Sequence, residues 1–164
     1  MFHNKTALRR PFVAAAVLAA CALTASAASA ATLTLGQPSL TGRVAVTEPV
    51  TVTCSAFDPS LTLDSESVNV QAEQAAGKAI ARGSSSKFGF LPALLFPCDG
   101  TETTIPVTLN ADPAGPPFHG GPAVFTASVA ATAATPCFPG STNCFTIPAA
   151  TQSASAGPTA LNMR

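Results

Sequence analysis

The sequence lacks tryptophan and tyrosine altogether, so its ten phenylalanines supply every aromatic ring. Carbohydrate sites usually present aromatic rings that also carry a polar group, and their absence argues against carbohydrate binding. Charged residues make up only 10% of the chain, against about a quarter in a typical globular protein. Residues 31–164 hold five basic and eight acidic side chains, a net charge of −3. Nucleic acids and anionic membranes are bound by clustered lysine and arginine, so we expect neither as a partner.

Catalytic and metal-binding patterns are equally scarce. Beyond residue 30 the only histidine is His119, and no G-x-S-x-G motif offers a serine to act with it. The absence of a C-x-x-C pair argues against a redox site. The closest two cysteines are also too far apart for a typical zinc site. We therefore predict no enzyme activity, no metal and no cofactor.

Three pairs of carboxylates could provide exceptions to that prediction. Asp64 with Glu66, and Asp99 with Glu102, are spaced closely enough to suggest glycosidic acid–base chemistry. Asp58 with Asp64 is the candidate for calcium. Sparse acids beside turns are usually solvated or hydrogen-bonded to the turn, so we assign no such role to any of them.

Residues 1–30 have the pattern of a cleaved signal peptide. A basic start that reaches Arg10 precedes the apolar run Pro11–Leu23, and Ala28–Ala30 offers the small-x-small pattern of a cleavage site. The strongly apolar part is too short to cross about 30 Å of hydrocarbon as a helix. We therefore predict a secreted, extracellular protein with no transmembrane helix in its mature form.

Two alternatives to ordinary secretion stay open. Leu18–Cys21 matches a lipobox, which would leave the protein lipid-anchored at Cys21 on the cell surface. Arg9–Val13 resembles a twin-arginine export motif, although paired arginines before an apolar run are common. Cleavage near Ala30 by the general pathway is the favoured interpretation.

Four cysteines follow the leader: Cys54, Cys98, Cys137 and Cys144. An even number of cysteines in a short exported domain predicts two disulfides. The loop between Cys137 and Cys144 contains a Pro-Gly turn that brings its ends together. We therefore pair Cys137 with Cys144, which leaves Cys54 to pair with Cys98.

Apolar and polar residues alternate in short runs separated by turn residues, a pattern typical of half-buried strands. In the early runs Val44 shares a face with Val46, and Cys54 points inward with Ala56. Glu48-Pro49 is expected to break the chain between these runs, and Gly83–Ser86 has the composition of a loop. The expected strands are 32–35, 44–46, 50–56, 67–73, 79–82, 104–110 and 123–132.

About seven short strands and no convincing amphipathic helix predict an all-β fold. The expected architecture is an immunoglobulin-like antiparallel β-sandwich. We assign 1–30 to the signal peptide, 31–150 to the sandwich, and 151–164 to either a C-terminal tail or a closing strand. We expect a monomer.

Several of these features occur together in one known class of proteins. They are a Val/Thr-rich strand that ends in Cys54, a hairpin at Gly77, a turn at Cys98–Gly100 and a long Ala/Val strand before a small cysteine loop. With them the chain resembles small secreted bacterial immunoglobulin-like domains of unknown function. Its architecture is also similar to that of neocarzinostatin-type apoproteins, secreted sandwiches that carry a hydrophobic enediyne. Those carriers close two short disulfide loops, whereas a Cys54–Cys98 bond closes a long one, so no binding residue is transferred.

The segment Phe88–Pro97 combines three phenylalanines and three leucines with two prolines that resist a central strand. A loop this apolar either folds over the core or forms an exposed contact surface. The neighbouring proline- and glycine-rich loop, Asp112–Gly121, would join that surface if the two loops shared one end of the sandwich. The candidate contact residues are Phe88, Phe90, Leu91, Leu94, Leu95, Phe96, Phe118 and His119.

The sequence thus favours an exported, non-enzymatic binding or structural module that acts at the cell envelope or outside the cell. Its expected partner is a protein or a cell-envelope component. One alternative is a secreted carrier of a small hydrophobic ligand, and a deep apolar pocket beside Phe88–Phe96 would favour it. The other is an unrecognised secreted hydrolase or inhibitor, which a cluster of His119 with two carboxylates would favour.

Overall fold

The computed structural model describes residues 31–42, 44–136 and 148–164. Every regular element in these ranges is a β-strand, and all strand pairs are antiparallel. This confirms the prediction of an all-β antiparallel sandwich of about seven strands. The strands are β1 (Thr32–Leu35), β2 (Ser39–Thr41), β3 (Ala45–Thr53), β4 (Thr62–Ala76), β5 (Ala79–Phe90), β6 (Glu102–Ala111), β7 (Gly121–Ala134) and β8 (Pro148–Met163).

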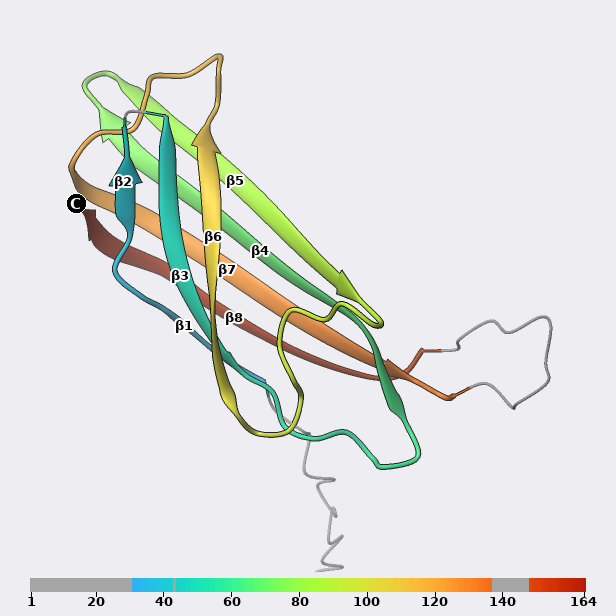
Figure 1. Cartoon of the computed structure of the whole chain (residues 1–164). Helices are drawn as coiled ribbons and strands as arrows, with labels where there is room; N and C mark the ends of the chain where they lie inside the picture. The colour runs from blue at the N-terminus through green and yellow to red at the C-terminus, as the bar shows by residue number, and fades with distance from the viewer. Residues whose placement is uncertain (1–30, 43, 137–147) are drawn as a thin grey trace, which may run out of the picture.

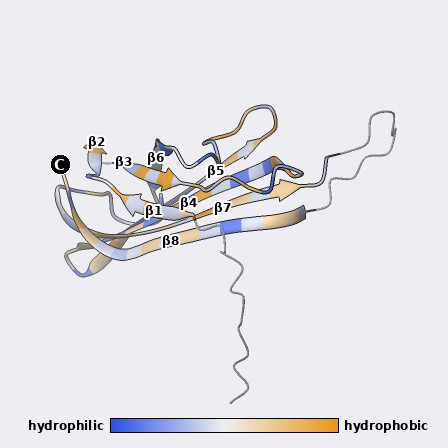
Figure 2. Cartoon of the chain, turned by 90° about the horizontal axis from the view of Figure 1, so that it is seen from below, coloured by the Kyte–Doolittle hydropathy of each residue, from blue (hydrophilic) through white to orange (hydrophobic). Residues whose placement is uncertain are grey.

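The strands lie in two layers (Figure 1). One layer holds β1, β2, β3 and β6, and the other holds β4, β5, β7 and β8. Seen from below, β7 and β8 lie on the opposite side of the molecule from β2, β3 and β6 (Figure 2). The layers connect where Gly83 and Ser84 of β5 pair with β6. On the other side, the amide of Leu40 donates to the carbonyl of Arg164 (2.6 Å), which joins β2 to the end of the chain.

The core lies between the layers and is built by the period-two alternation of the strands. Every second side chain of a strand points to the same face, so the inward positions of β3, β4, β6 and β7 meet in the middle. Large apolar side chains that are at most 6% exposed include Val46, Val50, Val52, Val68, Val70, Ile105, Val107, Leu109, Phe125 and Val129.

The expected break at Glu48-Pro49 is wrong, because β3 runs through both residues. Pro49 lies opposite Pro106 of β6, and its carbonyl accepts the amide of Gly36 (2.8 Å). Alternate residues of an antiparallel strand hydrogen-bond to opposite neighbours, so the missing N–H of Pro49 faces away from β6. The β3–β6 ladder therefore loses no hydrogen bond at this proline.

Two residues expected to point inward are exposed instead. Val44 is 64% exposed because it lies in the turn between β2 and β3. Ala56 is exposed because β3 has already ended at Thr53. Beyond that point the carbonyl of Cys54 accepts the amide of Gly100 (2.8 Å), which takes the chain out of the strand pairing.

Gly83–Ser86 is also not a loop but the middle of β5. A side chain on Gly83 would place its Cβ 2.7 Å from the carbonyl oxygen of Asn110 and 2.9 Å from the ring of Phe118. The glycine is therefore needed for close packing inside the sheet, since glycine in a strand often marks a close approach of another part of the backbone.

Residues 148–163 form β8, which pairs with β7 along most of its length. The segment 151–164 thus belongs to a closing strand rather than a tail. In the described ranges no helix is long and apolar enough to cross a membrane. Residues 1–30, which are predicted to be a signal peptide and contain Cys21, and the predicted Cys137–Cys144 pair lie outside the described residues.

Candidate functional site

Three large apolar side chains are exposed together where β5 ends. Phe88 and Phe90 are 62% and 60% exposed, and Leu91, directly after the strand, is 52% exposed. Alternation places both phenylalanines on the outer face of β5, because the inward positions between and before them are Gly89 and Lys87. We call Phe88, Phe90 and Leu91 the Phe88–Leu91 patch.

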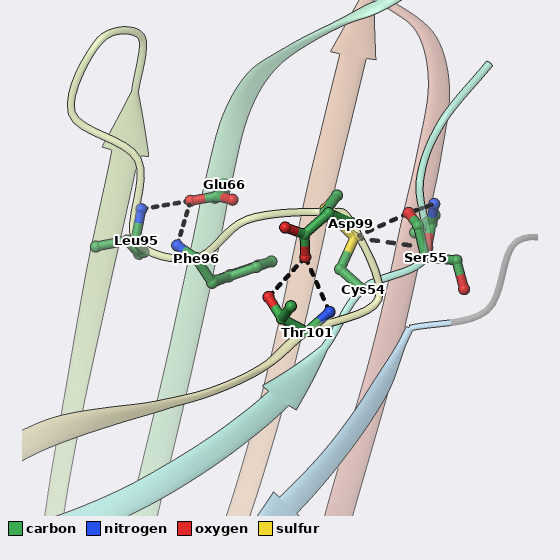
Figure 3. Close-up of a disulfide and its surroundings, with 9 residues drawn as sticks. Cys54, Ser55, Glu66, Leu95, Phe96, Asp99 and Thr101 are labelled. Carbon is green, nitrogen blue, oxygen red and sulfur yellow. Dashed lines mark hydrogen bonds between the residues drawn. A yellow bond between two sulfur atoms is a disulfide. The ribbon is translucent and has the colours of Figure 1, made fainter. Parts of the chain in front are cut away.

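The chain that follows the patch is fixed by a buried carboxylate. Glu66 of β4 is 2% exposed, and its Oε2 accepts the amides of Leu95 (2.5 Å) and Phe96 (3.2 Å), as Figure 3 shows. Burial raises the pKa of the Glu66 carboxyl, and these two hydrogen bonds oppose the rise. Hydrogen bonds to a carboxylate are stronger than those between neutral groups, so Glu66 docks this segment against β4.

A disulfide fixes the far end of the same segment. Cys54 and Cys98 are bonded, with their Cα atoms 4.5 Å apart, which confirms this predicted pair. Immediately after the bond, Oδ1 of Asp99 accepts the backbone amide (2.9 Å) and the hydroxyl (2.6 Å) of Thr101 (Figure 3). These hydrogen bonds lower the pKa of Asp99. The segment that follows the patch is thus held by Glu66 at Leu95 and Phe96, and by the disulfide at Cys98.

Beside the two phenylalanines lies an open groove of about 200 Å³ on the outer face of the sheet. Pockets that enclose small molecules usually measure about 300–1,000 Å³. The groove therefore lacks the deep apolar form that a carrier of a hydrophobic ligand would need here. Its lining includes Ser65, Ser67, Phe88, Phe90, Ala130 and Thr132.

The structure brings together only part of the predicted contact surface. Leu94 and Leu95 are half-buried, and Phe96 is 3% exposed because it packs into the core. These three residues cover the end of the sandwich. Of the candidate residues in the segment Phe88–Pro97, only those of the Phe88–Leu91 patch remain exposed for contact.

Phe118 and His119 do not belong to this surface. Phe118 is fully buried. His119 is exposed, but its ring nitrogens lie against the carbonyl oxygens of Gly120 (2.8 Å) and Ala75 (3.0 Å). Phe90 pairs with Ser65 of β4, ten positions from Ala75, which corresponds to about 33 Å along a strand. The two loops therefore lie at opposite ends of the sandwich.

Three of the five acidic candidates, Asp58, Glu66 and Asp99, take structural positions. Glu66 holds backbone amides, and Asp99 closes a turn. Oδ1 of Asp58 accepts the amide (2.8 Å) and the hydroxyl (2.5 Å) of Ser60, which lowers its pKa. Within the described residues, no three His, Cys, Asp or Glu side chains are grouped so that they could hold a metal ion.

Sequence reasoning missed three further polar side chains in the interior. Gln74 of β4 exchanges two hydrogen bonds with the backbone of His119, and Gln152 of β8 donates to the carbonyl of Ser55 (2.8 Å). Glu48 of β3 is fully buried, and neither of its oxygens has a hydrogen-bond partner. Burial raises the pKa of Glu48 to about 7, although the nearby Gly36 amide lowers it somewhat. The inward positions of the alternating runs could have revealed Glu48 and Gln74, but the weak pattern around Gln152 gives no such signal.

Comparison with known proteins gives no relative from which a function could be transferred: no family model, no curated protein and no solved structure matches this chain.

Proposed function

We propose that this chain is an exported, non-enzymatic module that binds a partner macromolecule at the cell envelope or outside the cell through the Phe88–Leu91 patch. The observation that carries the proposal is the exposure of Phe88, Phe90 and Leu91, each more than half open to solvent at one end of one strand. Their joint apolar area is roughly 300–400 Å². Exposed patches of that size on single domains are often functional.

The rigid support of the patch strengthens the proposal. Binding costs free energy when loops become ordered, but this patch begins in β5 and continues into a segment held by Glu66 and Cys98. Aromatic side chains on a preformed surface are typical centres of protein interfaces. The small groove beside them favours a macromolecular partner over an enclosed ligand.

The proposed location outside the cell rests on two features of the chain. The first is the basic, apolar and small-residue pattern of residues 1–30. The second is the Cys54–Cys98 bond, which is consistent with the oxidising conditions in which structural disulfides persist.

Site-specific photo-crosslinking of the full chain in its native host tests the proposal. A benzophenone amino acid at position 88 or 90 should give adducts heavier than the chain itself, since both side chains face the partner. Ile80 provides the matched control, because it is on the same strand and 47% exposed but lies at the opposite end. The absence of adducts at 88 and 90, or equal adducts at position 80, would refute the proposal.

A further inference from the structure

One edge of β5 has no partner over part of its length. The strand pairs with β4 from Ala79 to Phe90, but with β6 only at Gly83 and Ser84. If that register continued, Phe88 would lie opposite Pro106 of β6. Within the described residues no such pairing occurs, because the two strands diverge where the sandwich separates into its layers. In Figure 1, β5 is the outermost strand of its layer.

The free backbone groups of this edge can be identified from their neighbours. Alternate residues of a strand hydrogen-bond to opposite sides. The carbonyl of Arg82 accepts the amide of Asp112 (2.7 Å), so the even-numbered residues of β5 face away from β4. At the other end, the carbonyl of Phe90 accepts the amide of Ala93 (2.6 Å). Between these two occupied positions, Ser86 and Phe88 present their amides and carbonyls outward.

This free window is symmetric about Lys87. If the same edge of two copies paired in antiparallel fashion with a two-fold axis at Lys87, Ser86 of each copy would lie opposite Phe88 of the other. Each such pair exchanges two hydrogen bonds, so all the free amides and carbonyls of the window would be satisfied by four bonds. An interface of two identical, self-complementary patches is the commonest form of protein dimer.

The side chains fit the same arrangement. Phe88 and Phe90 lie on the outer face, so pairing would bring four phenylalanine rings together on one continuous surface. The rings of Phe88 from the two copies would be diagonal neighbours, about 7–8 Å apart, a separation that aromatic side chains can bridge. Lys87 lies on the inner face, where its Nζ donates to the carbonyl of Pro106 (2.5 Å), which directs its charge toward β6.

We infer that the free edge of β5 binds a second copy of this chain, forming a two-fold dimer centred on Lys87 and covered by the Phe88–Leu91 patch. The inference rests on the proposed function, since it names the partner of the same patch, and it replaces the expectation of a monomer. The contact is short compared with a standard interface of about 800 Å² per partner. The dimer is therefore weak, and its fraction rises with protein concentration.

Sedimentation of the full-length secreted product over a range from about 10 μM to 1 mM tests the association. Ser86→Pro removes one outward-facing amide per copy but none from the β4 ladder, and proline is tolerated at such edge positions. This variant should stay folded and monomeric at every concentration. Ser86→Ala is the matched control, because it removes the same hydroxyl, which donates to Asn69 (2.5 Å), but keeps the amide; it should form dimers like the wild type.

A disulfide trap tests the register. In the dimer the two copies of residue 87 form a non-hydrogen-bonded pair with Cα atoms about 4.5 Å apart, which is within the range for a disulfide. Lys87→Cys should therefore give covalent dimers under mild oxidation, at least tenfold more than Ile80→Cys on the same strand. A wild type that stays monomeric at 1 mM, or equal trapping at positions 87 and 80, would overturn the inference.

The crosslinking experiment separates this inference from the proposed function. Adducts of position 88 with a different protein, from a chain that stays monomeric, would overturn self-association and leave the binding function standing. The absence of adducts of any mass would overturn both. Adducts of twice the mass of the chain support both.

Discussion

Glu66 and Gly89 lie opposite each other in β4 and β5, and the space beside the glycine is filled by the backbone of Leu95. The Glu66 carboxylate accepts the amide of Leu95 at this point. A returning segment of chain is therefore docked on the strand pair whose outer face carries Phe88 and Phe90. This inner contact fixes the chain that follows the patch, while alternation along β5 places Phe88 and Phe90 on the exposed outer face.

Gly89→Ala should destabilise the protein by about 1–3 kcal/mol, the usual cost of overpacking a rigid site. The added Cβ would lie 2.8 Å from the Leu95 nitrogen, and backbone atoms cannot easily move aside. Urea unfolding measures the change. Gly115→Ala is the control, since its Cβ would approach no atom closer than 3.5 Å. Equal stability of the two variants would show that the close approach at Gly89 is unimportant.

Gln74→Leu should cost about 1–3 kcal/mol, because it leaves buried backbone groups unsatisfied. The Gln74 side chain donates to the carbonyl of His119 (2.7 Å) and accepts its amide (2.9 Å), which ties the Asp112–Gly121 loop to β4. Hydrogen exchange should show that the His119 amide loses protection. The same substitution at Gln71, an exposed residue of the same strand, should change stability by less than about 0.5 kcal/mol. A neutral effect at Gln74 would contradict the role of this side chain.

Removal of the Cys54–Cys98 bond should lower the free energy of unfolding by about 4 kcal/mol, the loop-entropy value for a sequence separation of 44 residues. The double variant Cys54→Ala/Cys98→Ala avoids a free thiol, and urea unfolding with circular dichroism measures its stability. Its far-ultraviolet spectrum should remain that of a β protein at low denaturant. A loss below about 1 kcal/mol would mean that the bond adds little to the hydrogen bonds of Glu66.

The sequence alone predicts the alternating faces of the strands well, because these depend on local signals, and it predicts the Cys54–Cys98 bond only by elimination. Alternation places Val50, Val52 and Cys54 on one face, and β3 has that pattern. The break at Pro49 was wrong because the cost of a proline depends on which neighbour its N–H would face. That direction follows from pairing with Pro106, a residue 57 positions away, and it cannot be read locally.

The same dependence on long-range strand pairing explains why only some of the candidate contact residues form the exposed patch. Apolar composition identifies the segment Phe88–Pro97 as unusual, and its first residues do form the exposed patch. Burial of Phe96 depends on Glu66, 30 positions away. Placement of His119 at the opposite end depends on the pairing of β4 with β5. Long-range register, which no single run of residues specifies, therefore separates the exposed residues Phe88, Phe90 and Leu91 from the other candidates.

Glu48 should make the protein less stable as the pH rises from about 4.5 to about 7. Its carboxyl has a pKa of about 7 in the folded protein, against an ordinary value of 4.5, because burial disfavours the charged form. The folded state thus binds the proton more tightly, and this stabilisation is complete below pH 4.5 and lost as the pH passes 7. The difference amounts to about 3 kcal/mol. Glu66, whose pKa is also raised, contributes with the same sign, whereas Asp58 and Asp99, whose pKa values are lowered, act only in more acidic solution.

Glu48→Gln should match the wild type at pH 4.5 and exceed its stability by about 3 kcal/mol at pH 8, as measured by urea unfolding at both values. Parallel pH profiles for the two proteins would show that the Glu48 carboxyl is already charged, or already hydrated, at the lower pH.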